Sequence, residues 1–195
     1  SSDVCSSDLK IAKGFFLLTS KPTLFACNVK EEDLGVLTKG ERSGKTGEQV
    51  KKVEEYCKQR LASKSVVVSA QIESELVDLP EAEGKEYLAG LGVTESGVGA
   101  LIRATYDLLG LRTYLTTGPK ESRAWTIHAG DRAPQAAGVI HTDFERGFIA
   151  AETVGFTDLK CAGTMAKVRE AGKLRVEGKE YVVQDGDVME FRFNV

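Results

Sequence analysis

Two apolar runs in the first half of the chain end on polar groups that could hydrogen-bond a ligand. The first covers residues 23–27 and follows a proline, and the second covers residues 65–68. Continuous apolar runs of this length are typical of strands buried on both faces of a parallel sheet. Open α/β sheets bind ligands just beyond the carboxyl ends of such strands. Asn28, Glu31 and Ser69 are the polar residues at these positions and are therefore candidate ligand contacts, and Val29 and Ala70 are their neighbours in the chain.

The elements around these residues must bring the two strand ends together. Residues 47–62 are expected to form an amphipathic helix, because its apolar residues fall on one face. They are Val50, Val53, Cys57 and Leu61. A right-handed strand–helix–strand crossover then places Asn28 and Ser69 at the same sheet edge. Ser69 is equally compatible with a simple helix N-cap. Residues 32–46 are expected to form a polar loop, and residues 72–110 to be helical.

The sequence GERSGKT at residues 40–46 resembles a phosphate-binding P-loop but lacks its spacing. A P-loop has four residues between its first and second glycines, whereas three lie between Gly40 and Gly44. No apolar strand directly precedes Gly40, so a flexible basic loop is the better interpretation. We therefore assign no catalytic residue and no Mg²⁺ ligand.

From Arg112 onward the hydrophobic period changes to two, which is typical of strands. Residues 123–127 and 189–195 alternate, residues 148–156 are expected to form a longer strand, and Pro134–Ile140 is expected to be a short helix. Several strands with one helix in about eighty residues predict a β-grasp domain.

Composition limits the classes of function. The net charge of −3 and the pI near 5.6 argue against a strongly basic nucleic-acid arm, and no apolar run is long enough for a membrane helix. The four cysteines have no metal-site spacing and suit a reducing cytoplasm. Residues 112–195 carry twelve basic and twelve acidic residues. Any RNA contact must be a local patch, for which the candidates are Lys120, Arg123, His128 and Arg132, although ordinary surface charge explains each equally well.

The order strand, N-x-x-E, helix, strand, S-A resembles the base-recognition loops of GTPase-like domains. With Asn28 first and Glu31 fourth, the loop is similar to that of YchF-type ATPases, an ATP-preferring branch of the Obg-related P-loop GTPase family. Residues 122–154 and 177–195 resemble the TGS domain at the C-terminus of the same proteins. One departure is Ala150, where the family usually has arginine.

This resemblance implies an α/β fold. Residues 10–111 would be the C-terminal part of a nucleotide-binding domain with a partial P-loop GTPase-like parallel sheet. Residues 112–195 would be a ubiquitin-like β-grasp (TGS) domain. Residues 1–9 are interpreted as non-native, and the P-loop half, with its Mg²⁺ ligands, as missing.

The resemblance also implies a function. The parent protein would be a cytoplasmic enzyme that hydrolyses ATP in preference to GTP, and Asn28 and Val29 would contact the adenine. It would bind the ribosome (large subunit) or RNA through its TGS domain, with no membrane partner, and this chain alone would be inactive. The alternative is a stand-alone TGS module that binds ribosome, RNA or protein without catalysis.

Overall fold

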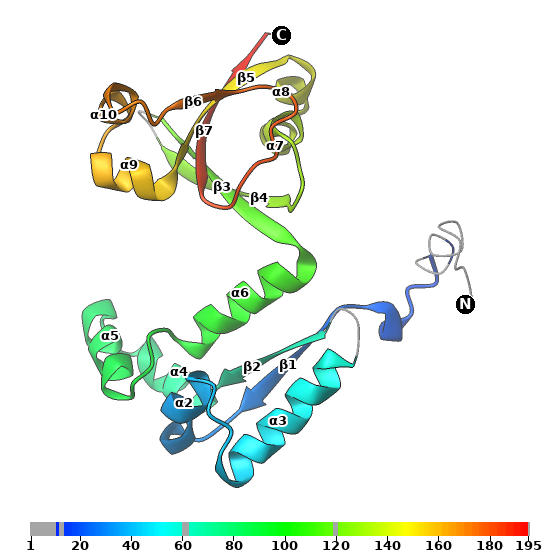
Figure 1. Cartoon of the computed structure of the whole chain (residues 1–195), viewed down its shortest axis with the longest axis vertical. Coiled ribbons are helices and arrows are strands. Elements are labelled where there is room, and N and C mark those ends of the chain that lie inside the picture. The colour runs from blue at the N-terminus through cyan, green and yellow to red at the C-terminus, as the bar shows by residue number, and fades with distance from the viewer. Residues whose placement is uncertain (1–10, 12–13, 60–62, 119–120, 195) are drawn as a thin grey trace. The chain divides into compact units, whose positions relative to one another are not determined.

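The computed structural model describes residues 11, 14–59, 63–118 and 121–194, and it divides the chain into two units, Ser1–Leu109 and Gly110–Val195 (Figure 1). The interpretation of residues 1–9 lies outside the described residues. The expected domain boundary, at residues 111 and 112, falls at the start of a strand. The elements of the first unit are η1 (Leu18–Ser20), β1 (Thr23–Asn28), α2 (Glu31–Thr38), α3 (Gly44–Lys58), β2 (Ser63–Val68), α4 (Ala70–Val77), α5 (Glu81–Gly90) and α6 (Gly97–Leu109). Those of the second are β3 (Leu111–Thr117), β4 (Ser122–His128), α7 (Ala133–Ile140), α8 (Thr142–Arg146), β5 (Phe148–Gly155), α9 (Phe156–Ala162), α10 (Met165–Glu170), β6 (Arg175–Glu177) and β7 (Asp187–Phe193).

Strands β1 and β2 form a two-stranded parallel sheet in which Asn28 is the partner of Val68. The parallel pairing and the intervening helix α3 are confirmed. The expectation that both strands are buried on both faces is wrong, because most of their residues are only half-buried or exposed. Among the described residues each strand has a single partner strand, so each has one open edge. The core of this unit lies between the sheet and α2, α3, α4 and α5 and includes Leu34, Leu37, Val50 and Ile72.

The polar loop expected over residues 32–46 is also corrected. Residues 31–38 are helix α2, and α3 begins at Gly44. Helix α2 has three acidic residues in its first turn, where negative charge is favourable, and it buries only Leu34 and Leu37. Two apolar contacts in eight residues are too few to give a clear helical period in the sequence.

The helical region expected over residues 72–110 consists of the helices α4, α5 and α6. Pro80 lies directly before α5, and Gly92, with a φ of +72°, follows it. Helix α6 begins where the Ser96 hydroxyl accepts a hydrogen bond from the Gly99 N–H (3.0 Å), and it ends before Gly110, whose φ is +65°. Ile11 and Gly14 are helical, and η1 follows them.

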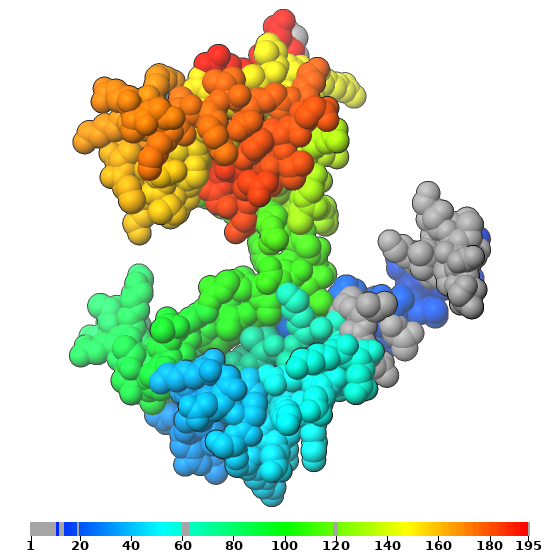
Figure 2. All heavy atoms as spheres, in the orientation of Figure 1, coloured from blue at the N-terminus to red at the C-terminus, as the bar shows by residue number. Residues whose placement is uncertain are grey.

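The second unit is built on a five-stranded mixed sheet in the order β4-β3-β7-β5-β6. Strands β3 and β7 are parallel, and the other neighbours are antiparallel. Helix α7 buries Ala133, Ala136 and Ala137 against one face, together with Tyr114 and Phe148. Helices α9 and α10 cover part of the other face, where Val154, Val168 and Val188 are buried. Figure 2 shows the described atoms of this unit, whose colours run from green through yellow to red.

No helix among the described residues has both the length and the apolar character that crossing a membrane requires.

Candidate functional site

The carboxyl ends of β1 and β2 meet in a hydrogen-bonded corner. The Asn28 Oδ1 atom accepts a hydrogen bond from the Ala70 main-chain N–H at 3.0 Å. One residue further, the Val29 N–H donates to the Val68 carbonyl at 2.9 Å. Asn28 is the last residue of β1 and Ala70 the first of α4, so the crossover brings together residues on either side of α3. The expected juxtaposition of the two strand ends is confirmed.

The corner offers main-chain and amide groups rather than apolar side chains. The Val29 side chain is buried in the core, which leaves only its main-chain carbonyl available to a ligand. Ser69 is 1% exposed, and within the described residues its hydroxyl has no hydrogen-bond partner. Ser69 occupies the N-cap position of α4, but its side chain makes no capping bond. Asn28 and Ala70 are both exposed.

Glu31 lies beside this corner, at the first position of α2. It borders an open pocket of about 610 Å³, whose lining residues are Lys30, Glu31, Glu32, Gly35, Val36, Lys39, Gln71 and Leu91. The Tyr87 hydroxyl is 2.7 Å from Glu75 Oε2 and 3.4 Å from Glu31 Oε1. The hydrogen bond to Glu75, followed by burial and the Glu31 charge, raises the pKa of Tyr87 to about 12. Tyr87 therefore stays a protonated donor at neutral pH and faces both carboxylates.

The sequence gives little sign of this tyrosine. Tyr87 is 56 residues from Glu31 and lies on another helix, so only the tertiary fold brings the two together. Gln71, which follows the S-A pair in the sequence, is brought to the same pocket as Glu31.

These groups can bind a ligand, but they hold no reactive constellation. Within the described residues no group of histidine, cysteine, aspartate or glutamate side chains is arranged to hold a metal ion. The residues at 44–46 begin helix α3 and do not form a phosphate-binding loop between a strand and a helix. What the corner offers is hydrogen-bonding groups, the Asn28 carboxamide and the main chain next to it.

Of the four basic residues proposed for RNA contact, the three that the structure describes are not gathered on one face. Lys120 lies outside the described residues. Arg123 and His128 are five residues apart on β4, so their side chains point to opposite faces of the sheet. The Arg123 guanidinium lies 4.3 Å from the centre of the Trp125 ring, and Arg132 pairs with Glu180 at 2.5 Å. Of the four, Arg123 is an exposed cation on an aromatic platform.

A buried carboxylate on β5 is a further charged group that the sequence did not single out. The Glu152 side chain is 7% exposed and is paired with both Arg169 (2.9 Å) and Arg192. Burial opposes its ionisation, but the hydrogen bonds from the two arginines outweigh burial and lower its pKa. Arg169 and Arg192 are themselves more than half exposed.

The family model YchF-GTPase_C, described as a protein of unknown function (DUF933), matches residues 111–194. The "Ribosome-binding ATPase YchF" of Bacillus subtilis (strain 168) is 52% identical over 186 residues, which are 95% of this chain and 49% of that protein. The "Obg-like ATPase 1" of Oryza sativa subsp. japonica is 38% identical over 190 residues, 97% of this chain and 46% of that protein.

A solved structure of the Schizosaccharomyces pombe YchF GTPase has a TM-score of 0.76 and 32% sequence identity, covering 98% of this chain and 49% of that one. The chain thus spans about half the length of the relatives it matches. On the strength of these matches, the chain belongs to the YchF family and corresponds to the C-terminal part of its members.

Proposed function

We propose that this chain supplies the base-binding end of the nucleotide site of an ATP-hydrolysing, ribosome-associated protein. The observation that carries the proposal is the hydrogen bond from the Ala70 N–H to Asn28 Oδ1 at the carboxyl ends of two parallel strands. This is where open α/β sheets bind ligands. The name of the Bacillus subtilis relative, a ribosome-binding ATPase, supports the same function.

The groups at the corner fit an adenine ring. Asn28 has a side-chain N–H₂ and a second lone pair on Oδ1, and the Val29 carbonyl is an additional acceptor. Adenine presents an amino donor next to ring-nitrogen acceptors, which these groups complement. We therefore assign the base contacts to Asn28 and to the main chain of Val29, with Ala70 and the buried Ser69 shaping the corner.

Glu31 supports a preference for ATP over GTP. GTPase-like loops use an aspartate at this position to accept two hydrogen bonds from guanine. Glu31 has one more methylene group, and its carboxylate faces the Tyr87 hydroxyl. A guanine ring would have to draw Glu31 away from Tyr87, whereas adenine has no ring N–H for a carboxylate to accept.

When bound, ATP supplies the phosphoanhydride bond to be hydrolysed. Phosphoryl transfer requires a loop that cradles the phosphates and a Mg²⁺ ion. This sequence contains no G-x-x-x-x-G-K-[ST] motif, so we assign no residue to the phosphates or to Mg²⁺. The purified chain should show no Mg²⁺-dependent ATP turnover, and measurable turnover would contradict that assignment.

Titration of the ¹⁵N-labelled chain with AMP and with GMP tests the base site. AMP should shift the amide signals of Val29 and Ala70, and GMP should shift them less at the same concentration. Asn28→Ala should abolish the AMP shifts, whereas Asn194→Ala, a matched change at the chain's other asparagine, should leave them unchanged. Equal shifts with both nucleotides would contradict the proposed preference.

The second unit is proposed to be a β-grasp TGS domain that contacts the ribosome or RNA. The unit has two hydrophobic clusters of its own, one on each face of its sheet, so it can serve as a binding module independently of the nucleotide site. This independence also favours the alternative function, a TGS module that acts without catalysis. The two functions differ in whether nucleotide binds at Asn28.

A further inference from the structure

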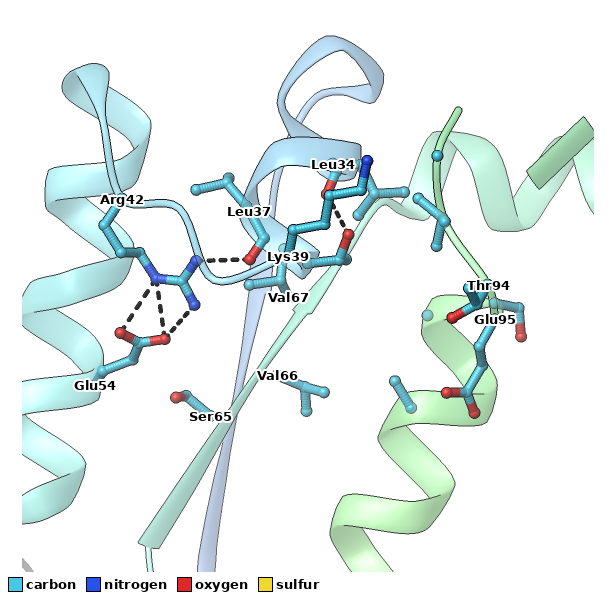
Figure 3. Close-up of a pocket in the computed structure, with 16 residues that line it drawn as sticks. Leu34, Leu37, Lys39, Arg42, Glu54, Ser65, Val66, Val67, Thr94 and Glu95 are labelled. Atoms are coloured by element: carbon cyan, nitrogen blue, oxygen red, sulfur yellow. Dashed lines mark hydrogen bonds and ion pairs between the residues drawn. The ribbon is translucent and has the colours of Figure 1, made fainter. Parts of the chain in front are cut away.

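A groove runs along the open edge of strand β2. It has a volume of about 390 Å³ and is lined by α2, α3, β2, the start of α6 and the connections before α3 and α6. In Figure 3 β2 lies between α3 on one side and α6 on the other, with Ser65 and Val66 pointing in opposite directions. Asn28, Glu31 and Ala70 do not line this groove, and Lys39 borders both it and the pocket beside Glu31.

The main chain of β2 presents unpaired groups to this groove. The Val68 carbonyl accepts from the Val29 N–H, so the main chain of Val68 faces β1. Alternate residues of a strand direct their N–H and C=O groups to opposite edges. Val66 therefore also faces β1, and the N–H and C=O groups of Ser65 and Val67 face the groove. An open edge of this kind is a template for one more strand.

The wall on the α3 side is held in place by Arg42. Its guanidinium donates to the Leu37 carbonyl (2.6 Å) and the Glu41 carbonyl (2.7 Å) and pairs with Glu54 at 2.5 Å. The Arg42 and Glu54 side chains are 20% and 29% exposed. Because this network joins the end of α2 to α3, the groove is preformed.

Among the charged residues described around the groove, Lys39 is the one whose charge is not offset by a neighbour. The Arg42 and Glu54 charges offset each other, and Glu95 pairs with Arg103. Within the described residues, the Lys39 ammonium has no ion pair or hydrogen bond. Lys39 lies over Gly92, where an added methyl group would come within 2.9 Å of its Nζ atom. A ligand with a carboxylate would complement this end of the groove.

Because α3 and α6 flank this edge, the occupant it suits is a single extended segment rather than the sheet edge of a second copy. We propose that the groove is a docking site for an extended peptide that carries an acidic side chain. The peptide adds a strand to β2 through the main chains of Ser65 and Val67 and places its carboxylate against Lys39. This inference does not rest on the nucleotide site.

The test uses the full chain and the synthetic probe acetyl-Thr-Val-Glu-Val-Thr-Val-amide, followed by ¹⁵N NMR. The probe should shift the amide signals of Ser65 and Val67 more than those of Lys64 and Val66. The probe should also slow the hydrogen exchange of the Ser65 and Val67 amides. In the free chain these two amides should exchange faster than those of Lys64 and Val66. No binding at millimolar probe, or shifts without this alternation, would overturn the proposal.

Two modified probes test main-chain pairing. One carries N-methyl groups on its odd-numbered residues, and the other carries them on its even-numbered residues. A strand pairs through one edge only, so one of them should bind and the other should not. Equal binding of both would overturn the proposal.

Two lysine variants test the charge. Lys39→Glu should weaken binding of the acidic probe about fivefold at low salt. Lys52→Glu, an equal charge change on α3 away from the groove, should not weaken it. When the probe's glutamate is replaced by glutamine, Lys39→Glu and the unmodified chain should bind the probe with nearly the same affinity. If Lys39→Glu binds the acidic probe as the unmodified chain does, the proposed acidic recognition is wrong.

Discussion

The Asn28 carboxamide and the Ala70 main chain are joined by a 3.0 Å hydrogen bond between positions 42 residues apart. The bond fixes the end of β1 to the start of α4 and leaves the Asn28 amide N–H₂ group free to face a ligand. Because both residues are exposed, this corner is accessible to a nucleotide base.

Two substitutions at Asn28 separate the structural role of its side chain from the proposed binding role. Asn28→Asp keeps an oxygen that accepts from the Ala70 N–H but removes the N–H₂ donor, so stability should be retained and AMP binding lost. Asn28→Ala removes both and should also lower the free energy of unfolding by about 1 kcal/mol. Urea denaturation and AMP titration of both variants check this. If Asn28→Asp still binds AMP, the Asn28 amide group is not a donor to the nucleotide base.

Glu152 should be important for the stability of the second unit. Glu152→Gln removes the charge that Arg169 and Arg192 share inside a nearly buried site. The expected loss is about 1–3 kcal/mol, and the exposure of both arginines favours the lower end. Glu190→Gln is the matched control, because Glu190 is the exposed partner of Glu152 on the neighbouring strand. Equal loss in both variants would show that the ion pairs are not the cause.

The same carboxylate predicts a pH dependence. Its folded-state pKa lies below its ordinary value of 4.5, because hydrogen bonds from the two arginines outweigh the effect of burial. A lowered pKa gives stability that is fully present above about pH 4.5 and is lost as the pH falls through the folded-state pKa. Glu152→Gln should therefore lose less stability than the unmodified chain between pH 5 and the acid transition. Parallel acid unfolding curves for the two proteins would contradict this.

Gly147 should not tolerate a side chain. A Cβ atom there would collide with the main-chain carbonyl group of Asn194, whose N–H donates a hydrogen bond to the Gly147 carbonyl at 2.9 Å. Gly147→Ala should destabilise the second unit by about 1–3 kcal/mol, as overpacking does. At Gly178 an added Cβ meets nothing within 4 Å, so Gly178→Ala is the matched control. Thermal unfolding distinguishes the two variants, and equal melting temperatures would show that the chain end near Asn194 yields easily.

Ribosome or RNA binding should be steeply salt-dependent, because phosphate contacts release counterions. Arg123→Ala should weaken binding and reduce the salt slope, since this cation lies exposed on the Trp125 ring. Arg132→Ala should have a smaller effect, because Arg132 is paired with Glu180. Arg146→Ala, an exposed arginine on α8, is the control. Binding that is absent, or unchanged in both Arg123 and Arg132 variants, would exclude the proposed contact.

Hydrogen exchange should differ between the two units. Strands β1 and β2 are at best half-buried, whereas four consecutive residues of β5, Ala151–Val154, are buried. Amides of β1 and β2 should therefore exchange faster than those of β5 and β7. Uniform protection across both units would contradict this difference.

The sequence was most informative where a local hydrophobic pattern could be combined with the rule that strand–helix–strand crossovers are right-handed. Two apolar runs joined by an amphipathic helix predicted parallel strands, and the crossover rule then placed Asn28 beside the residues after β2. Helix α2 was missed because only Leu34 and Leu37 face its core.

Other features depend on contacts between distant residues, which no local period reveals. Tyr87 reaches Glu31 across 56 residues, and Arg42 clamps the end of α2 to Glu54 on α3. The burial of Ser69, which leaves its hydroxyl unpaired, likewise depends on how α4 packs.

The most direct test of the account is an NMR measurement of nuclear Overhauser contacts between the ring protons of AMP and the full chain. Adenine binding at the corner predicts contacts from the adenine ring to the Ala70 methyl group, and weaker ones from GMP under the same conditions. Adenine contacts confined to other residues, or none at any accessible concentration, would contradict the assignment of Asn28 and its neighbours to a nucleotide base.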